Sequence, residues 1–258
     1  MSRFSREDLS AFVNEHYRPD RMILSAAGGI DHDTLCKLAE KAFGDLPKPK
    51  ISHQSGAASF SGGEFRRDKK LEQAHFALAF ESPSYKSRDI YTAQVYSIAL
   101  GGGMSSRLFQ QIREKRGLCY SIFAQAGAFS DTGFTTIYAG TSAEQIPDLA
   151  NLTVNELKRA ALDLSEAEVT RARSQMKAGL LMGLESPSSR AERLARMIQI
   201  WGKVPSLDET ITKIDSVNLE KVSAYAEQVM TQAKFAMALY GPIASAPSLE
   251  ELDALRAA

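Results

Sequence analysis

The sequence has few of the residues that bind metal ions, and these are not clustered. Its two cysteines, Cys36 and Cys119, lie far apart and form no Cys-x-x-Cys pair, which excludes a disulfide framework and a cysteine-based zinc knuckle. Neither His-Glu-x-x-His nor His-x-x-Glu-His occurs, and the four histidines are dispersed: His16, His32, His53 and His75. We therefore expect no metal site in this chain, and the low cysteine content favours a reducing compartment.

The sequence also lacks an excess of charge of either sign and any long apolar run. Lysine plus arginine and aspartate plus glutamate number 31 each, so no overall field favours nucleic acid or an anionic membrane as a partner. No segment approaches the roughly 18 apolar residues that span a bilayer, and the charged N-terminus does not resemble a secretion signal. The composition, 44% hydrophobic and 24% charged, is typical of a globular protein with one large or two modest domains.

Motifs for nucleophilic catalysis and for nucleotide binding are missing as well. No Gly-x-Ser-x-Gly occurs, and Cys119 has no nearby histidine in the sequence to raise its thiolate fraction, so we expect it to be a packed strand residue. The run Gly101-Gly102-Gly103 precedes a helix, but the Lys-Ser/Thr of a P-loop and the spacing of a dinucleotide fingerprint are absent. A nucleotide ligand is therefore not expected.

Hydrophobic periodicity predicts a helix, a strand and a second helix in the first 46 residues. Ser5 is a suitable N-cap for the first helix, with acidic residues in the first turn. Residues 22–27 have the composition of a buried strand that ends at Gly28-Gly29, and the second helix ends at Gly44. This order of elements predicts an α+β segment with one strand.

The next stretch has no periodicity. From about Pro47 to Gly63 it is rich in Pro, Ser, Gly and Lys, and we assign residues 47–72 to a linker. Beyond it, the sequence predicts the following elements: a strand around 76–80, helices at 88–100 and 105–116, a hairpin of strands 118–128 and 133–141, helical stretches from 144 to 230 broken at Ser186-Pro187 and Val204-Pro205, and a strand at 235–240. Together these elements predict a second α+β segment.

The beginning of the chain resembles its end. Residues 7–30 align with residues 220–243 at a constant offset of 213 without a gap, and five of the 24 paired positions are identical. The predicted helix, strand and glycine turn coincide; the alternative is a chance similarity of two amphipathic helices. If the repeat is real, the chain carries the truncated tail of a first domain in residues 1–46, the linker 47–72, and a complete second domain in residues 73–258.

One stretch, residues 100–121, could carry a site: Leu-Gly-Gly-Gly-Met-Ser-Ser-Arg-Leu-Phe-Gln-Gln-Ile-Arg-Glu-Lys-Arg-Gly-Leu-Cys-Tyr-Ser. Its glycines permit a close approach of the backbone, Ser105 or Ser106 can cap a helix, and Leu108 and Ile112 give that helix a buried face. Gly117 then ends the helix.

Two side chains of this stretch could converge near one helix end. Arg113 lies in the last turn and Tyr120 opens the next strand, so a guanidinium and a phenol would lie close together. The alternative is an ordinary surface helix in which Arg113 only complements the C-terminal dipole.

This stretch closely resembles the second-domain signature of the mitochondrial processing peptidases and their bacterial relatives, which belong with pitrilysin and insulin-degrading enzyme among the inverted-zincin peptidases. The resemblance covers the whole chain. It implies an α+β fold with a mixed, mainly antiparallel sheet covered by helices, duplicated in the parent protein. In that family the first domain binds zinc through His-x-x-Glu-His and a later Glu, which here would lie upstream of Met1, so zinc is expected in the parent protein and none on this chain.

The resemblance also implies roles for individual residues. Arg113 and Tyr120 match in type and spacing an Arg and a Tyr that contact the substrate backbone near the scissile bond and help to stabilise the charge on its carbonyl oxygen. The turn Gly101, Gly102 and Gly103, with Ser105 and Ser106, resembles a loop that helps to admit substrate.

The expected parent is a zinc metalloendopeptidase that cleaves peptides or presequences, and this chain alone is expected to be inactive. Two alternatives stay open: a noncatalytic partner subunit of a two-chain peptidase of the same family, and a structural scaffold subunit.

The expected partners are a peptide substrate and a zinc-bearing first domain or partner subunit, with neither nucleic acid nor membrane. The expected compartment is the bacterial cytoplasm, with the mitochondrial matrix as the alternative. Residues 1–46 should leave an apolar patch exposed where the rest of a first domain would cover them, and such a patch promotes self-association as a homodimer.

Overall fold

The structure is a computed structural model that describes residues 4–46 and 56–258. The chain divides into two compact units, and each is described by itself. The first unit comprises residues 1–56 and 181–205, and the second comprises residues 57–180 and 206–258. In the described residues, no helix combines the length and the apolar character needed to cross a membrane.

The first unit contains the two helices that the sequence predicts near the N-terminus. Its elements are α1 (Arg6–His16), the short 3-10 helix η1 (Pro19–Arg21), α2 (His32–Phe43) and α6 (Pro187–Trp201). Ser5 caps α1 in a capping box with Asp8, because each side chain accepts a hydrogen bond from the other residue's backbone N–H. Asp31 caps α2, which ends at Gly44 as predicted.

Residues 22–27 are not part of a sheet, so the strand predicted there is wrong for this structure. They lie in an irregular segment between η1 and α2. A strand is defined by hydrogen bonds to a neighbouring strand, and this segment pairs with no other described segment. The hydrophobic pattern of residues 22–27 indicates that this segment could pair in a sheet, but it does not show that a neighbouring strand is present.

The second unit is built on one five-stranded sheet, in the order β1-β5-β2-β4-β3. The strands are β1 (Gly63–Asp68), β2 (Ala74–Glu81), β3 (Ser121–Ala128), β4 (Gly133–Thr141) and β5 (Phe235–Gly241). β1 runs parallel to β5, and all other pairs are antiparallel. The mixed, mainly antiparallel sheet and the β3–β4 hairpin confirm the predicted fold class.

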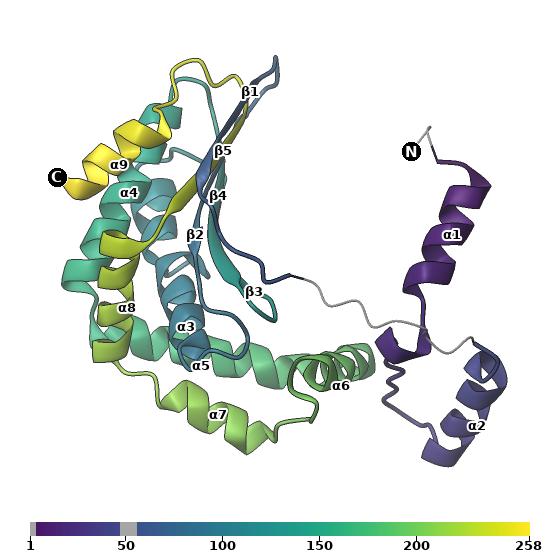
Figure 1. The fold of residues 1–258 in the computed structure, drawn as a ribbon. Helices are drawn as coiled ribbons and strands as arrows, with labels where there is room; N and C mark the ends of the chain where they lie inside the picture. The colour runs from purple at the N-terminus through teal and green to yellow at the C-terminus, as the bar shows by residue number, and fades with distance from the viewer. Residues whose placement is uncertain (1–3, 47–55) are drawn as a thin grey trace. The chain divides into compact units, whose positions relative to one another are not determined.

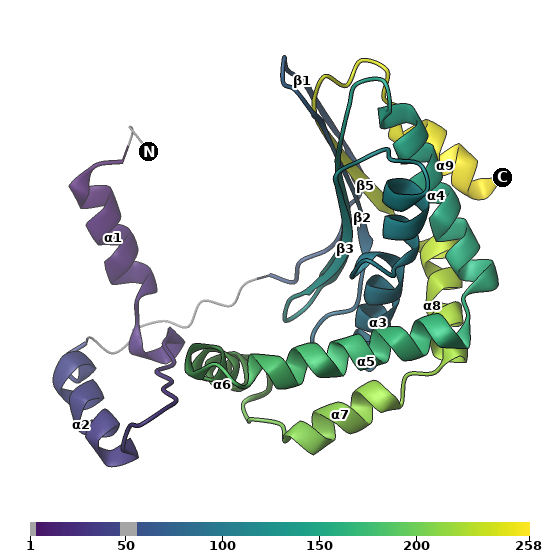
Figure 2. The same ribbon diagram turned by 180° about the vertical axis from the view of Figure 1, so that it is seen from behind.

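Helices cover one face of this sheet. In the two opposite views, α3, α4, α8 and α9 lie on the same side of the strands (Figures 1 and 2). The helices that lie wholly or mainly in the second unit are α3 (Ile90–Gly101), the π-helix η2 (Phe109–Glu114), α4 (Ile146–Asp163), α5 (Glu166–Gly183), α7 (Leu207–Asp215), α8 (Leu219–Gln232) and α9 (Leu249–Ala257).

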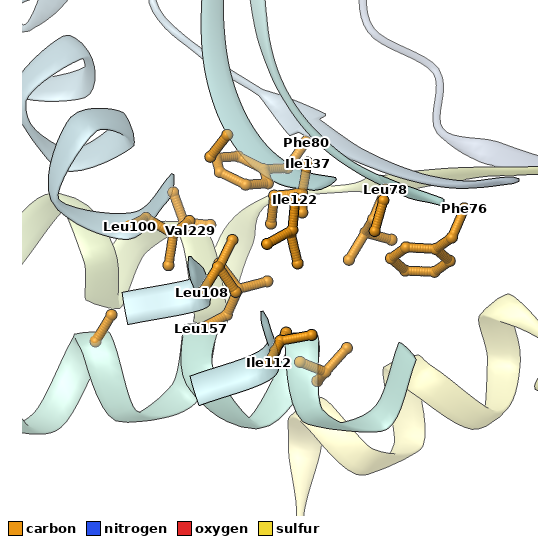
Figure 3. Packing of buried hydrophobic residues seen from close by; sticks show 14 of the residues in the cluster. Phe76, Leu78, Phe80, Leu100, Leu108, Ile112, Ile122, Ile137, Leu157 and Val229 are labelled. Atoms are coloured by element: carbon orange, nitrogen blue, oxygen red, sulfur yellow. The ribbon is translucent and has the colours of Figure 1, made fainter. Parts of the chain in front are cut away.

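The core lies between the sheet and the helix layer. Alternate side chains of β2 point into it: Phe76, Leu78 and Phe80 are fully buried, and the residues between them are only half-buried. Figure 3 shows these side chains packed with others from the helices and strands: Leu100, Leu108, Ile112, Ile122, Ile137, Leu157 and Val229. This alternation is the period of two that a sheet with one covered face requires.

The first strand lies inside the stretch 47–72 that the sequence assigns to a linker. Residues 47–55 lie outside the described residues, but Gly63–Asp68 forms the edge strand β1, and every one of its residues is exposed. Arg66 fixes this edge, because its guanidinium donates hydrogen bonds to the carbonyl oxygens of Ile243 and Ala246, at 3.3 and 2.8 Å. An exposed, charged edge strand gives no hydrophobic alternation to detect.

The two copies of the sequence repeat have the same local structure. α1 and α8 begin at the equivalent positions Arg6 and Leu219, and the N-caps Ser5 and Asn218 both accept a hydrogen bond from the backbone N–H three residues on. Gly28 and Gly241 both have positive φ values, of 121° and 111°, which glycine adopts at low cost. The copies differ in pairing and in burial: β5 is in a sheet and residues 22–27 are not, and α8 has buried residues whereas α1 has none.

Candidate functional site

The π-helix η2 and the turn after it place Arg113 and Tyr120. Leu108 and Ile112 are fully buried, and they fix the face that this helix turns toward the core. Gly117, with φ of 62°, ends the helix as predicted, and its N–H donates to the carbonyl of Arg113 at 2.9 Å. The chain then enters β3 directly after Tyr120.

The structure brings Arg113 and Tyr120 together. The Cζ atom of Arg113 lies 5.2 Å from the ring centroid of Tyr120 and 4.6 Å from that of Phe109. A guanidinium over an aromatic face is held by a cation–π attraction. Tyr120 is 80% exposed, and Arg113 keeps about a third of its side chain exposed, with Glu114 Oε1 4.0 Å from its Nε.

This arrangement leaves hydrogen-bond donors on partly or largely exposed side chains. In residues 4–46 and 56–258, no acceptor lies within hydrogen-bond distance of the Arg113 guanidinium. Its planar N–H groups can donate two parallel bonds to a carboxylate or one to a carbonyl oxygen. The Tyr120 hydroxyl can donate one more, so the pair suits an extended chain with free backbone carbonyls.

The glycine turn before the helix is tightly packed. A Cβ atom at Gly101 would lie 2.4 Å from the backbone nitrogen of Ala124 in β3, so only glycine allows α3 to approach that strand. A Cβ at Gly102 would lie 2.6 Å from Cα of Ile98, and one at Gly103 would lie 3.0 Å from the amide nitrogen of Gln175. Gly101 and Gly102 therefore have a packing role, whatever else they do, whereas the neighbour of Gly103 is the end of a flexible side chain.

Ser105 and Ser106 behave differently from the predicted caps. No side chain caps η2, and Ser106, which is buried, donates its hydroxyl to the carbonyl of Gly103 at 2.5 Å. Ser105 is exposed, and its carbonyl accepts a hydrogen bond from Arg171 in α5 at 3.4 Å. The cap prediction is wrong: Ser106 directly precedes the helical residues, but its hydroxyl donates to the turn before them and does not accept from a helical N–H.

No sequence pattern indicates the role of Arg107, which anchors the start of this segment. Its guanidinium pairs with the carboxylates of Asp163 and Glu168, with Nε 2.6 Å from Glu168 Oε1. Burial raises the pKa of Glu168, but hydrogen bonds from Arg107 and Ser165 outweigh it and lower this pKa to about 2. The partners lie 56 and 61 residues away, so no local pattern reveals the cluster.

The described residues do not fit a zinc ion. They contain no group of three or more His, Cys, Asp or Glu side chains that could hold a metal. His75 Nδ1 lies 2.7 Å from the hydroxyl of Tyr138, and His32 Nε2 lies 3.5 Å from Cys36 Sγ without a third ligand. Cys119 is buried as predicted, and burial raises the pKa of its thiol to about 11.

Comparisons with known proteins agree with these features. Residues 3–176 match the family described as "Peptidase M16 inactive domain". The chain is 36% identical over 251 residues to an uncharacterized zinc protease of Bacillus subtilis, covering 96% of this chain and 60% of the relative. It is 34% identical over 240 residues to an uncharacterized zinc protease of Rickettsia bellii, covering 93% of this chain and 58% of the relative. This chain thus spans about 60% of the length of the relatives it matches.

A solved structure has the same fold. A chain of "Complex III2 from Candida albicans, Inz-5 bound" aligns with a TM-score of 0.83 and 23% identity, covering 98% of this chain and 63% of that chain. At this identity the likeness shows the fold alone.

Proposed function

Because the chain belongs to the peptidase M16 family, as its inactive C-terminal domain type, we propose that it is the substrate-positioning half of a zinc metalloendopeptidase that cleaves peptides or presequences. The observation that supports this proposal most directly is the pair formed by Arg113 and Tyr120. A partly exposed guanidinium held against an exposed phenol is suited to binding the carbonyl groups of an extended peptide.

The pair acts through binding and charge. Arg113 donates to a substrate carbonyl, and its positive charge stabilises negative charge that develops on the oxygen. Tyr120 adds a hydroxyl donor and a flat apolar ring against which the peptide lies. The cation–π contact of the Arg113 guanidinium with the Phe109 ring, at 4.6 Å, restricts the guanidinium before substrate arrives, which lowers the entropy cost of binding.

The zinc ion and its general base are proposed to come from a zinc-bearing first domain or from a partner subunit of the same family. The absence of a fitting ligand set from the described residues and the naming of the relatives as zinc proteases support this division. In this arrangement residues 1–46 are the tail of the zinc-type domain, and the second domain comprises residues 73–258 together with the edge strand β1, which pairs with β5. The proposed compartment is the bacterial cytoplasm, in keeping with the bacterial relatives.

A second candidate is a noncatalytic partner or scaffold subunit. It is supported by the fold shared with a chain of complex III from Candida albicans. In this role the chain would support assembly, and Arg113 and Tyr120 would have no substrate.

Peptidase activity separates these functions. We would assay cleavage of an unstructured basic peptide, with zinc present, by this chain alone and by a fusion protein. In the fusion protein, the part of the Bacillus subtilis relative that does not align with this chain is placed before residue 1. We expect the chain alone to be inactive and the fusion protein to be active.

Substitutions in the fusion protein then test the site. Removing an oxyanion donor typically costs about 100-fold or more in rate, so Arg113→Ala should lower kcat/KM by about that factor, and Tyr120→Phe by less. Arg116→Ala is the matched control, because Arg116 is an exposed cation at the same helix end, and its guanidinium donates to the carbonyl of Gln111 in the same helix. An inactive fusion protein, or equal effects of Arg113→Ala and Arg116→Ala, would favour the partner or scaffold function.

A further inference from the structure

A polar cavity of about 440 Å³ lies in the second unit, at the end of the sheet where β2 finishes. Its walls are the residues that follow β2, the turn between β3 and β4, the start of α3 and the last turn of α8. All of these residues belong to the second unit. The volume is in the range of cavities that hold small organic ligands.

This cavity is separate from the pair formed by Arg113 and Tyr120. Tyr120 opens β3 at the same end of the sheet as the start of β2, because β3 and β2 both run antiparallel to β4. The cavity lies around Glu81, the last residue of β2. The two ends of this strand are on the order of 20 Å apart, at about 3.4 Å per residue, so the cavity is a second site.

Buried hydroxyl groups form the floor of the cavity. Ser82 and Tyr225 both line it and are 7% and 8% exposed, and their hydroxyl oxygens lie 3.1 Å apart. Thr135 Oγ1 donates to Ser82 Oγ at 3.2 Å. A hydroxyl oxygen has two lone pairs. Whichever of Ser82 and Tyr225 donates to the other, the Tyr225 oxygen therefore keeps a lone pair for a hydrogen-bond donor inside the cavity.

Exposed carboxylates also line the cavity, and no cation balances them there. Glu81, Asp89 and Asp131 come from the end of β2, the start of α3 and the turn between β3 and β4. Among the described residues of the lining, none is Lys, Arg or His. The nearby Lys86 and Arg88 are exposed and lie outside the lining. The cavity therefore favours a positively charged ligand.

The end of α8 adds to this negative charge. Gln228 and Gln232 of its last turn line the cavity, and this turn contains no basic residue. The last four carbonyl groups of a helix have no partner within the helix and carry partial negative charge. α3 begins at the cavity with its positive end, but its N-cap residue is Asp89, whose carboxylate offsets that charge. The two glutamine amides supply further oxygen acceptors.

The carboxylates are spread around the cavity and do not meet at one point. In residues 4–46 and 56–258, no three His, Cys, Asp or Glu side chains are grouped so that they could hold a metal ion. A divalent metal ion needs several oxygen ligands around one centre, whereas an aliphatic amine with two or more ammonium groups carries its charges apart. Pro83 and Val229 in the lining offer apolar surface to the methylene groups between those charges.

We infer that this cavity binds aliphatic ammonium groups, at least two of them joined through methylene chains. Glu81 and Asp89 pair with the ammonium groups, and the Tyr225 oxygen accepts a hydrogen bond from one of them. The same chemistry is offered by a free polyamine and by neighbouring lysine side chains of a peptide. The inference does not rest on the proposed function of Arg113 and Tyr120.

Isothermal titration calorimetry of this chain with spermidine tests the inference, at low ionic strength because salt screens such ion pairs. We expect saturable binding of one spermidine per chain. Glu81→Gln and Asp89→Asn should each weaken binding by up to about fivefold, as the loss of an exposed ion pair does, and Tyr225→Phe should weaken it by a similar factor. Both carboxylates are exposed, so these two substitutions should leave the fold intact, which urea unfolding checks.

Two control variants should bind spermidine like the wild type. Glu227→Gln is the matched control, because Glu227 is an exposed carboxylate of α8 outside the lining. Arg113→Ala separates this site from the proposed peptide-positioning pair. A blocked Lys-Lys dipeptide distinguishes the two sources: tighter binding than spermidine identifies a basic peptide as the ligand, and weaker binding identifies a free polyamine.

Three results would overturn the inference. The first is no saturable binding of either spermidine or the dipeptide. The second is displacement of spermidine by an equal concentration of Mg²⁺, because this would reduce the site to a general attraction for cations. The third is wild-type affinity in the double variant Glu81→Gln with Asp89→Asn, which would place the binding elsewhere on the chain.

Discussion

Acidification should remove the stabilisation that Glu168 gives to the second unit. Glu168 accepts hydrogen bonds from Arg107 and Ser165, and these lower its pKa from 4.5 to about 2 in spite of its burial. Because the folded-state pKa is lower than the unfolded-state pKa, the carboxylate contributes stability above about pH 4.5. This contribution is lost as the pH falls from there through about 2.

The magnitude follows from the size of the shift. A pKa lowered from 4.5 to about 2 corresponds to about 3 kcal/mol of differential interaction. Part of the carboxylate meets solvent, since 17% of the side chain is exposed, which screens the pair and reduces the expected contribution to about 2 kcal/mol. Glu168→Gln should lower the free energy of unfolding by this amount at neutral pH.

Urea unfolding at a series of pH values measures this effect. The difference in unfolding free energy between the wild type and Glu168→Gln should be largest near neutral pH and should approach zero at about pH 2. Glu166→Gln is the control, because Glu166 is mostly exposed and its pairing with Arg173 spans 3.3 Å, so its effect should be small. A difference for Glu168→Gln that does not change with pH would refute the reasoning.

Three further predictions concern the packing around the site. In thermal unfolding, Gly101→Ala should destabilise the chain by about 2 kcal/mol or more, since its Cβ would meet the backbone nitrogen of Ala124 at 2.4 Å. Gly179→Ala in α5, where the space is open, should instead stabilise the chain by about 0.5–1 kcal/mol. Leu157→Ala in α4 should lower the free energy of unfolding in urea by about 2–5 kcal/mol. Leu162→Ala in the same helix should lower it by less than about 0.5 kcal/mol, because Leu162 is 86% exposed. Iodoacetamide near pH 8 should modify exposed Cys36 and spare buried Cys119, whose pKa is raised to about 11. Mass spectrometry of the two cysteine-containing peptides measures the order of modification, and faster modification of Cys119 would contradict this prediction.

The sequence predicts those parts of the fold in which local pattern and environment agree. β2 is predicted because Phe76, Leu78 and Phe80 alternate with smaller residues and one face of the strand is covered. β1 was missed because all its residues are exposed and its place depends on β5, which follows it by more than 160 residues. Residues 22–27 show the converse, because a strand pattern without neighbouring strands leaves the backbone unpaired.

The same distinction holds for the candidate site. The convergence of Arg113 and Tyr120 is predictable because a helix end, Gly117 and a strand follow one another within a few residues. The anchoring of Arg107 by Asp163 and Glu168 is not, since it joins segments that only the tertiary fold brings together. Ser106 was assigned to the wrong role because its hydroxyl bonds the turn before the helix.

The most direct test of the proposed function is a double-mutant cycle on kcat/KM in the active fusion protein. Arg113 and Tyr120 lie in contact, and residues that act as a unit on one substrate group give strongly non-additive losses. The account predicts that the double variant Arg113→Ala with Tyr120→Phe is hardly slower than Arg113→Ala alone. Losses that multiply, or single variants as active as the wild type, would contradict it.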